Sequence, residues 1–362
     1  MIIVPAKNIL FGEHSVVYPP NSAVIATNSL FCKAEVSSNN TSSLINVNIA
    51  GEFRLNSRYE HAHLLGYLDE VRKAYLIFQS NGDYETLKDK IINNDDLLKL
   101  AIAVVLDRLN DLQLTIHGFN LYLLSQVPLQ SGFGSSAVFS SAVIAAILDF
   151  TGKPFDKNLI FDLTMEIEAF QHLSPSGEGP AAVIYGDLVK LTKTMAGKPI
   201  IEKIKLKNPE LREYVRSLTI VHSGMPKQST GELVGYVKST YTQNEKLIKD
   251  LELNTQKFLR INNDKHCDQL EFVQLINSSG RLLEKLGVVT ESVMEYSAKI
   301  RSLGGAVKIS GAGGRGQDGS GALLVYHEDR ELIKKISEDF KYKYFDIEFG
   351  RKGLQIQGKN KN

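Results

Sequence analysis

The segment Pro128-Leu-Gln-Ser-Gly-Phe-Gly-Ser-Ser-Ala137 decides how the rest of this chain is interpreted. It follows a predicted strand or hairpin within Leu112–Gln126 and opens an apolar helix predicted over Ser136–Phe150. Glycines let backbone N–H groups approach an anion without a Cβ in the way, and a helix N-terminus adds unpaired donors and partial positive charge. A serine hydroxyl at Ser135 or Ser136 can also bind Mg²⁺. The segment therefore predicts a phosphate-binding loop.

The residue types of this loop also allow a purely structural interpretation. A plain serine N-cap after a tight turn would give the same residue types without any ligand. The spacing of the glycines matches neither the GxxxxGK[ST] loop nor the dinucleotide-binding GxGxxG fingerprint. A phosphate-binding loop of another kind remains the prediction.

A second glycine-rich segment is Lys308-Ile-Ser-Gly-Ala-Gly-Gly-Arg-Gly-Gln-Asp-Gly-Ser-Gly321, with six glycines in the eleven residues after Ser310. A flexible surface loop is the structural alternative. However, the segment joins two predicted apolar strands, Ala306–Ile309 and Ala322–Tyr326, for which a short turn would suffice. A backbone that closes over a phosphate or a substrate explains the extra glycines better.

A third segment, Pro5-Ala-Lys-Asn-Ile-Leu-Phe-Gly-Glu-His14, places Lys7, Glu13 and His14 around an apolar strand. Each of these side chains alone would be interpreted as structural or solvated. Together, beside a glycine, they can line a polar pocket.

The remaining pattern predicts an α+β protein of two lobes, because strands and helices are mixed in both halves. The predicted further strands are Ile2–Pro5, Ala23–Thr27, Phe31–Val36, Ala181–Tyr185, Leu188–Lys190, Leu218–His222 and Tyr344–Ile347. The predicted further helices are Ala62–Gln79, Tyr84–Ile92, Leu97–Leu109, Lys157–His172, Thr230–Ile261, Asp268–Leu286, Glu291–Leu303 and Arg330–Phe340. The second lobe is expected to begin near Gly197–Asn208.

Composition excludes several classes of function. The chain has 362 residues, 43% of them hydrophobic, and a formal net charge of +1, which lacks the basic field of most nucleic-acid-binding proteins. No apolar run reaches the roughly 18 residues of a membrane span, and the start lacks the pattern of a signal peptide. Cys32 and Cys267 follow no metal-binding spacing and are expected to be ordinary buried thiols. A cytoplasmic protein with no membrane or nucleic-acid partner is therefore expected, with disorder only at Gly358–Asn362.

In chain order, Pro5–His14, Pro128–Ala137 and Lys308–Gly321 resemble the three motifs of the GHMP kinase superfamily. Gly12-Glu13-His14, followed by Val16-Val17-Tyr18, is most similar to the mevalonate kinases within it. Residues 168–185, with His172 and Pro175-Ser176-Gly177, resemble the stretch that carries the active-site carboxylates of that family. Ser223–Thr230 resembles its second-lobe substrate loop.

The resemblance implies a fold and a reaction. The first lobe, residues 1–190, would resemble a ribosomal-protein S5-type domain and bind ATP. The second lobe, residues 191–362, would be ferredoxin-like, with the ligands in the cleft between the lobes. The reaction would be ATP-dependent phosphorylation of mevalonate to 5-phosphomevalonate in isoprenoid precursor synthesis, with ATP and Mg²⁺ required. Relatives are often homodimers, so a homodimer is possible. The small-molecule substrate would be mevalonate or a similar hydroxy acid.

The resemblance also implies roles for individual residues. Lys7 would stabilise charge at the reacting hydroxyl, and Ser136 and Glu168 would bind Mg²⁺. Gly132, Gly134, Ser135, Ser136, Gly311 and Gly313 would bind the nucleotide phosphates, and Glu13, His14, Ser229, Thr230, Ser310 and Ala312 would bind the substrate. Glu166 is expected to be a helix-surface charge only.

The chain departs from the family pattern at the position of the usual catalytic aspartate, which is Gly179 here. Glu178 can replace it from a shifted backbone, Lys7 can act with substrate assistance, or the protein can bind ligands with little turnover. Motif two has Gln130 where a glycine is usual, and motif three carries an insertion, Arg315–Ser320. The fold would also suit a related substrate: phosphomevalonate, homoserine or a sugar.

Overall fold

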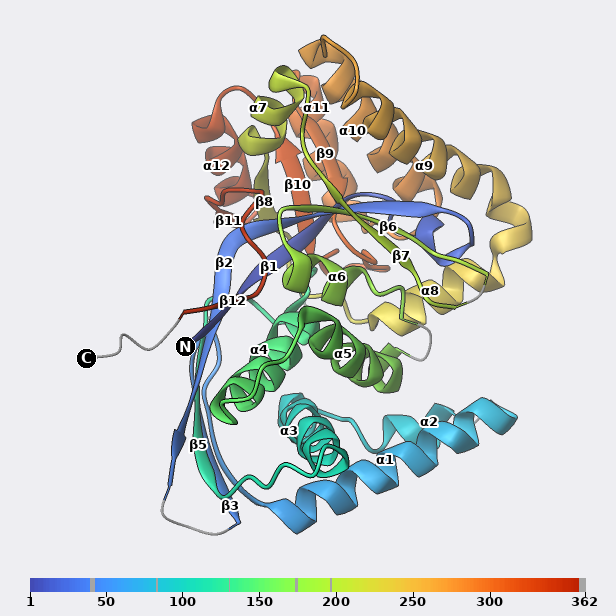
Figure 1. Ribbon diagram of the computed structural model, residues 1–362. Coiled ribbons are helices and arrows are strands. Elements are labelled where there is room, and N and C mark those ends of the chain that lie inside the picture. Colours follow the sequence, from blue (N-terminus) through green and yellow to red (C-terminus); the bar gives the residue numbers. More distant parts are fainter. Residues whose placement is uncertain (40–42, 83, 130, 173–174, 196, 358–362) are drawn as a thin grey trace.

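The structure is a computed structural model that describes residues 1–39, 43–82, 84–129, 131–172, 175–195 and 197–357. Eight strands form the larger sheet: β1 (Ile2–Phe11), β2 (Ser22–Ser38), β3 (Leu44–Gly51), β4 (Leu55–Glu60), β5 (Phe119–Ser125), β6 (Leu188–Thr192), β7 (Ile200–Ile204) and β12 (Gln355–Ile356). Their order is β12-β1-β2-β5-β3-β4, with β6 beside β2 and β7 beside β6. The β3–β5 pair is parallel. The long β1 and β2 extend from this sheet toward the second lobe (Figure 1).

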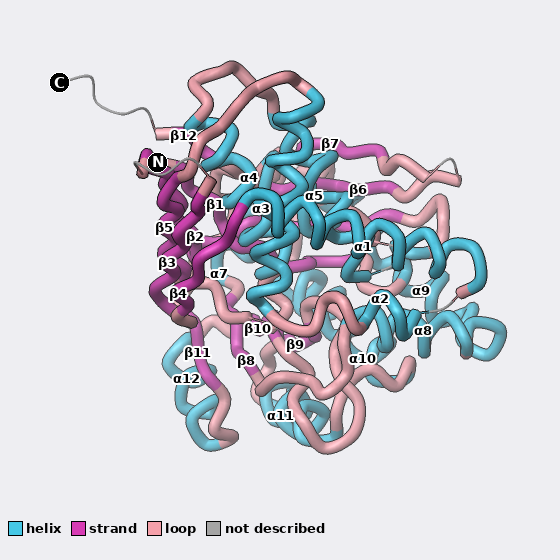
Figure 2. The backbone as a smooth tube through the Cα atoms, turned by 90° about the horizontal axis from the view of Figure 1, so that it is seen from below, coloured by secondary structure: helices cyan, strands magenta, loops and turns pink. Residues whose placement is uncertain are grey.

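One face of this sheet is covered by helices. These are α1 (His61–Asn81), α2 (Tyr84–Lys88), α3 (Asn94–Asp111), α4 (Ser135–Phe150), α5 (Lys157–His172) and α6 (Glu178–Tyr185). Figure 2 shows the strands β1 to β5 stacked on one side and α1, α3 and α4 on the other. In β5, Phe119, Leu121 and Leu123 are buried, whereas Tyr122 and Leu124 are exposed. This alternation is what a sheet with one solvated face requires.

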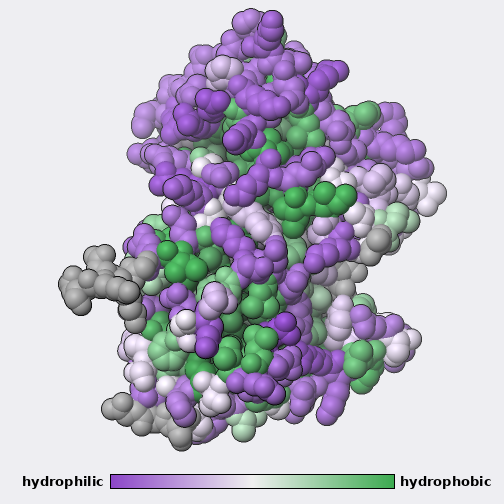
Figure 3. Space-filling view, viewed as in Figure 1, coloured by the Kyte–Doolittle hydropathy of each residue, from purple (hydrophilic) through white to green (hydrophobic). Residues whose placement is uncertain are grey.

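The second lobe is built on a four-stranded sheet of order β11-β8-β10-β9. Its strands are β8 (Thr219–His222), β9 (Ala306–Ile309), β10 (Ala322–Tyr326) and β11 (Lys343–Phe345). Its helices are α7 (Pro209–Ser217), α8 (Thr230–Ser239), α9 (Tyr241–Ile261), α10 (Gln269–Lys285), α11 (Glu291–Ser302) and α12 (Arg330–Asp339), and a 3₁₀ turn, η1 (Ser15–Val17), follows β1. None of the helices in the described part of the chain is long and apolar enough to cross a bilayer. Hydrophilic side chains predominate over the visible face of this lobe (Figure 3).

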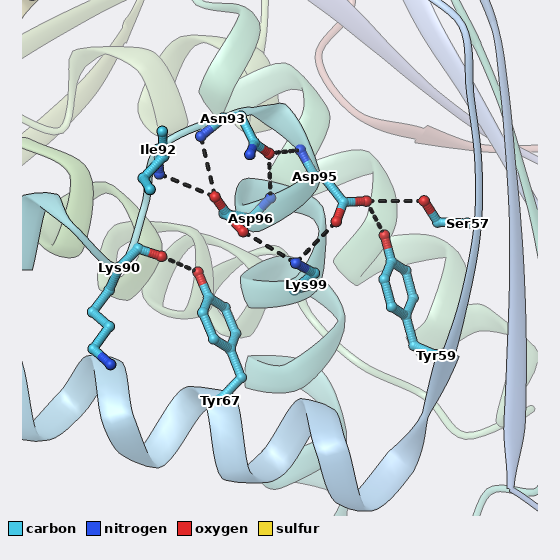
Figure 4. Close-up of polar contacts among 9 residues, drawn as sticks. All are labelled: Ser57, Tyr59, Tyr67, Lys90, Ile92, Asn93, Asp95, Asp96 and Lys99. Atoms are coloured by element: carbon cyan, nitrogen blue, oxygen red, sulfur yellow. Dashed lines mark hydrogen bonds and ion pairs between the residues drawn. The ribbon is translucent and has the colours of Figure 1, made fainter.

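A polar network at the start of α3 ties this helix to the strand β4 (Figure 4). The Asn93 side chain accepts hydrogen bonds from the N–H groups of Asp95 and Asp96. The Asp96 carboxylate in turn accepts from the Asn93 N–H, and the two interactions form a capping box. Asp95 also accepts from Tyr59 on β4, and Lys99 lies 2.9 Å from Asp95 and 3.1 Å from Asp96. The start of α3 is therefore fixed to the edge strand of the sheet.

The α+β, two-lobed fold is confirmed, and α4 and α5 lie where they were expected. The strand prediction for Ala181–Tyr185 is wrong, because these residues form most of α6. These residues are apolar on every side, which suits the buried position of α6. A short apolar run of this kind does not distinguish a strand from a buried helix. The helix predicted over Thr230–Ile261 is two helices that meet at Thr240.

Other predictions differ in extent. The strand or hairpin expected within Leu112–Gln126 is limited to the single strand β5, and β3, β4, β7, β12 and α7 were not predicted. Division of the chain at residue 190 stays a proposal: β6 spans this point, and β7 and β12 join the first sheet from beyond it. Gln130 and the tail from Gly358 lie outside the described residues.

Both cysteines are free and buried, as expected. Burial raises the pKa of the Cys32 thiol to about 12 and that of Cys267 to about 11. Such thiols are protonated and unreactive at neutral pH.

Candidate active site

The three glycine-containing motifs meet at the start of α4. The N–H of Lys7 on β1 donates to the carbonyl of Phe133, 3.1 Å away, which joins motifs one and two. The N–H of Ile9 donates to the Ser310 hydroxyl at 2.9 Å, which joins motifs one and three. At Gly132, a Cβ would lie 2.6 Å from the Ser310 carbonyl oxygen, so motifs two and three also touch. The structure thus brings together segments that are more than 300 residues apart.

The loop before α4 has the backbone geometry of an anion site. Gly132 and Gly134 have φ values of 83° and 70°, in the left-handed region that favours glycine. Gly134 is the N-cap of α4, and a glycine has no side chain with which to cap the helix. The alternative of a serine N-cap is therefore wrong. The first N–H groups of any helix have no partner within the helix, and an anion such as phosphate can accept from them.

Gly134 is also required by the packing of Lys7. A Cβ at position 134 would lie 2.6 Å from Lys7 Cε and 2.8 Å from Lys7 Cγ. Lys7 is 8% exposed, so its chain has little room to move away. The glycine therefore lets the lysine lie directly along the loop before α4.

Oxygen atoms from two helices converge next to this loop. The Ser136 hydroxyl on α4 lies 2.5 Å from Glu168 Oε1 and 2.5 Å from Gln171 Oε1 on α5. One hydroxyl proton serves only one of these oxygens at a time, which leaves lone pairs facing one another. Among the described residues, no group of three or more His, Cys, Asp or Glu side chains could hold a metal ion. A hard cation that keeps waters and phosphate oxygens as its other ligands, such as Mg²⁺, fits this donor set.

Glu178, at the start of α6, carries a carboxylate with one free oxygen. Its Oε2 accepts from the Ser176 hydroxyl at 2.8 Å, whereas Oε1 is buried without a hydrogen-bond partner among the residues the structure describes. Burial raises the pKa of Glu178, and the positive charge of Lys7 opposes that rise. Burial likewise lowers the pKa of Lys7, opposed by the negative charges of Glu178 and Glu168. The two groups are electrostatically coupled in one buried site.

Gly179 is the position at which the resemblance predicts an aspartate. A Cβ built on it would be 4.0 Å from Glu168 Oε2 and 3.0 Å from the Ala137 Cβ. A side chain at this position would therefore point toward the Ser136–Glu168 oxygens, but Ala137 would have to give way by a few tenths of an ångström.

Glu13 and His14 are buried between motifs one and three. Glu13 pairs with Lys308, whose ammonium also donates to the Ile309 carbonyl at 2.8 Å. Burial raises the pKa of Glu13 and lowers that of Lys308, while their mutual attraction opposes both shifts. Glu13 Oε2 is buried and has no hydrogen-bond partner in the described part of the chain.

The His14 ring is fixed by motif three. Its Nε2 lies 3.0 Å from the Ala312 carbonyl, and Nδ1 is buried without a described partner. Burial lowers the pKa of His14 to about 4, so the ring is neutral at pH 7. Since a carbonyl only accepts, Nε2 carries the proton and Nδ1 is left as an acceptor.

Ser229 and Thr230 stand apart from this cluster. Ser229 is the N-cap of α8, its hydroxyl accepts from the Glu232 N–H at 3.2 Å, and both residues are exposed. Their role in substrate binding stays a prediction.

Glu166, expected as a simple surface charge, lies 2.8 Å from Arg72, which also pairs with Asp107 at 2.7 Å. These pairs tie α5 to α1 and α3 on the partly exposed side of the helices.

Sequence reasoning missed three residues of the site. Gln171 was overlooked although it lies one turn after Glu168 on α5. Lys308 was quoted within motif three but given no role. Lys193, just after β6, has its pKa lowered by burial and by the nearby positive charge of Lys238, and it faces the negative charge of Glu178. Nothing in its sequence surroundings marks Lys193, because only the fold brings it to Glu178.

The chain is similar in sequence to known proteins. Residues 96–187 match the family model of the GHMP kinases N terminal domain. The chain is 27% identical to a protein named mevalonate kinase from Schizosaccharomyces pombe, over 97% of this chain and 90% of that one.

Solved structures show the same fold. The mevalonate kinase of Methanococcus jannaschii superposes with a TM-score of 0.72 at 21% identity, over 96% of this chain and 98% of that one. The mevalonate kinase of L. major, solved in complex with R-mevalonate, gives a TM-score of 0.68 at 20% identity, over 94% and 90% of the two chains. The two-lobed GHMP kinase fold is thus shared along nearly the whole chain.

Proposed function

We propose that this chain, a small-molecule kinase with the GHMP kinase fold, transfers the terminal phosphoryl group of ATP to mevalonate and releases 5-phosphomevalonate and ADP. The observation that carries the proposal is the meeting of the three motifs around the start of α4, where Gly134 is the N-cap, with the Ser136–Glu168 oxygens beside it. Similarity to a protein named mevalonate kinase over 97% of the chain supports the choice of acceptor.

The nucleotide would bind through backbone groups. N–H groups at the start of α4, with Gly132 and Gly134 leaving room for close approach, would hold the phosphates, and Gly311 and Gly313 would close from motif three. Ser136 and Glu168, with Gln171 beside them, would hold Mg²⁺. When bound, Mg²⁺ neutralises negative charge on the phosphates as the phosphoryl group moves.

Lys7 and Glu178 would act on the reacting hydroxyl. Glu178 Oε1 is the buried free oxygen that can accept the hydroxyl proton as the new O–P bond forms and the bond to ADP breaks. Lys7 lies beside Glu178 and the phosphate-binding loop, where its positive charge would stabilise the transferring group. Glu178 thus takes the role that the aspartate has in the family.

The acceptor would be a hydroxy acid whose carboxylate meets Lys193 and Lys238. Neither ammonium group forms an ion pair with another described residue. Two neighbouring positive charges repel each other, and an anion between them relieves that repulsion. Glu13, His14, Ser310 and Ala312 would line the other side of the acceptor, with the unpaired Glu13 Oε2 and His14 Nδ1 accepting from its hydroxyl groups. Ser229 and Thr230 would contribute from the α8 end.

The test is phosphoryl transfer from labelled ATP, with Mg²⁺, to a panel of mevalonate, phosphomevalonate, homoserine and galactose. We expect labelled 5-phosphomevalonate as the main product. If another acceptor is phosphorylated in preference, mevalonate is rejected as the acceptor, but the kinase activity is retained. No labelled product from any acceptor at high enzyme concentration would reject the kinase activity itself.

A second candidate is a ligand-binding protein with little turnover, which Gly179 favours. Calorimetry distinguishes the two: the second candidate requires tight binding of nucleotide or mevalonate alongside undetectable transfer. A cytoplasmic location and a homodimer also remain proposals, and light scattering of the purified protein tests the second of them.

A further inference from the structure

The segment Arg315–Ser320, the insertion within motif three, packs against the loop that precedes α8. The Arg315 N–H donates to the Gln228 side-chain oxygen at 3.0 Å, and Asp318 lies 3.1 Å from the Lys227 ammonium. A third contact is a hydrogen bond from the Ser320 N–H to the Ser223 hydroxyl at 2.9 Å. The whole segment therefore follows residues 223–228.

Glycines make this approach possible. The Gly321 N–H donates to the Gly224 carbonyl at 3.1 Å, and the Ser223 N–H donates back to the Gly321 carbonyl at 3.0 Å. A Cβ at Gly319 would collide with the Gly224 backbone, and one at Gly314 would lie 3.1 Å from the Pro226 side chain. A solvated loop would not need such close backbone contact.

The segment also reaches α8 itself. The Arg315 guanidinium lies 3.6 Å from the centre of the Tyr236 ring, the stacked geometry of a cation–π contact. Only Leu233 and Val237 of α8 are buried, so the apolar packing of this helix is slight. Elements with few buried contacts open easily unless another contact holds them. Arg315 supplies that contact from an exposed position.

The position of α8 matters for the acceptor. Lys238 lies in the last turn of α8, close enough to Lys193 to affect its pKa, and Lys193 in turn interacts with Glu178. Ser229 and Thr230 begin the same helix. A shift of α8 would move Lys238, Ser229 and Thr230 together. The start of α4 would not move with them, because it belongs to the other lobe.

We propose that Arg315–Ser320 is a latch that holds residues 223–229 and α8 against motif three, and that Arg315 is a positioning residue for the acceptor. The latch stands on contacts within this chain, and only the identity of the acceptor rests on the proposed function. Its removal should affect acceptor binding and leave nucleotide binding unchanged.

The test combines hydrogen exchange with kinetics on the full chain. In Arg315→Ala, backbone exchange in residues 223–229 and α8 should be about two- to fivefold faster than in the wild type, from the loss of one cation–π contact. The KM for the acceptor should rise by a similar factor, with the KM for ATP and kcat unchanged within about twofold. Arg315→Lys should be intermediate, because lysine keeps the charge but stacks less well.

Tyr236→Leu gives a second route to the same contact. Arg315→Ala and Tyr236→Leu should have similar effects on exchange and on the acceptor KM. The double variant should show no larger effect than either, because all three remove the same interaction. Lys33→Ala is the matched control, since Lys33 lies 4.9 Å from the Phe31 ring on β2, far from the latch. Unchanged exchange in Arg315→Ala, additive effects in the double variant, or an equal effect of Lys33→Ala would each overturn the latch.

The two proposals fail separately. If the wild type phosphorylates none of the acceptors, the proposed function fails, and the exchange measurements still decide the latch. If the wild type is active but Arg315→Ala raises both KM values equally, the acceptor-specific role is rejected.

Discussion

The Ser136 hydroxyl lies 2.5 Å from Glu168 Oε1, although the two residues are 32 positions apart and belong to different helices. The contact exists because α4 and α5 pack side by side, with the start of α4 near the end of α5. It places a carboxylate at the helix end where the phosphates are proposed to bind. The first prediction follows from this pair.

Glu168→Gln should weaken Mg²⁺ binding strongly. The substitution keeps the shape but removes the charge that would bind the cation. Loss of a charged partner costs about 1.5–3 kcal/mol, which corresponds to roughly a 10- to 100-fold higher Mg²⁺ concentration at half-maximal rate. Mg²⁺ titration of the transfer rate measures this.

Glu166→Gln is the matched control on the same helix. It breaks a partly exposed ion pair with Arg72, which is worth about 1 kcal/mol or less. Its Mg²⁺ titration should match the wild type. If the Mg²⁺ titration curves of the wild type, Glu168→Gln and Glu166→Gln are equal, Glu168 is not a ligand of Mg²⁺.

Gly134→Ala should lower kcat by about 100-fold, because the new methyl group displaces Lys7 from its place along the loop. The left-handed φ of 70° adds a conformational cost of about 1–2 kcal/mol to the folded state. Steady-state kinetics and chemical denaturation separate the two effects.

Gly152→Ala provides the comparison, since Gly152 has a φ of 69° and nothing within 4 Å of a new Cβ. It should lose similar stability but keep full activity. If Gly134→Ala also keeps full kcat, then the packing of Lys7 against position 134 has no catalytic consequence.

Glu178→Gln should lower kcat by about 10²–10⁴-fold, the usual contribution of a general base. In the wild type, kcat should fall on the acid side as Glu178 takes up a proton, at a pH above the ordinary pKa of 4.5 because burial raises its pKa. On the alkaline side, kcat should fall as Lys7 loses its charge, at a pH below 10.5. The pH profile of Glu178→Gln should lack the acid limb.

Gly179→Asp in the Glu178→Gln background should recover part of the lost rate, because the new carboxylate would point toward the same site. Gly179→Ala in that background introduces the same steric contact with Ala137 without the charge, and should recover nothing. An acid limb that persists in Glu178→Gln would assign proton removal to another group.

His14 should make the protein less stable in mild acid. Its pKa is about 4 in the folded protein against 6.5 ordinarily, so below pH 6.5 the unfolded chain binds a proton that the folded protein does not. Stability is therefore complete above pH 6.5 and falls by about 3 kcal/mol by pH 4. Urea denaturation between pH 7 and pH 4 measures this slope.

His14→Asn should flatten that slope, because asparagine does not titrate and tolerates the φ of 59° at this position. Equal slopes in the two proteins would show that other groups cause the acid sensitivity.

Much of the site could be predicted before the fold was known. The glycines at 132 and 134 and the following apolar helix predict a phosphate-binding loop through local backbone chemistry alone. The order of the three motifs carried the resemblance to the GHMP kinases. The helix over Lys157–His172 matches its apolar spacing residue for residue.

Tertiary structure decided what local chemistry leaves open. Residues 181–185 are apolar on every side, so only their burial beneath the sheet makes them a helix rather than a strand. Lys193 and Gln171 joined the site because separate elements fold around Glu178 and Ser136, and no local pattern encodes such distances. The sequence by itself determined which backbone groups can bind an anion, because that depends on residue type and neighbours. Which side chains surround that anion depends on contacts between distant segments, and only the folded chain makes those.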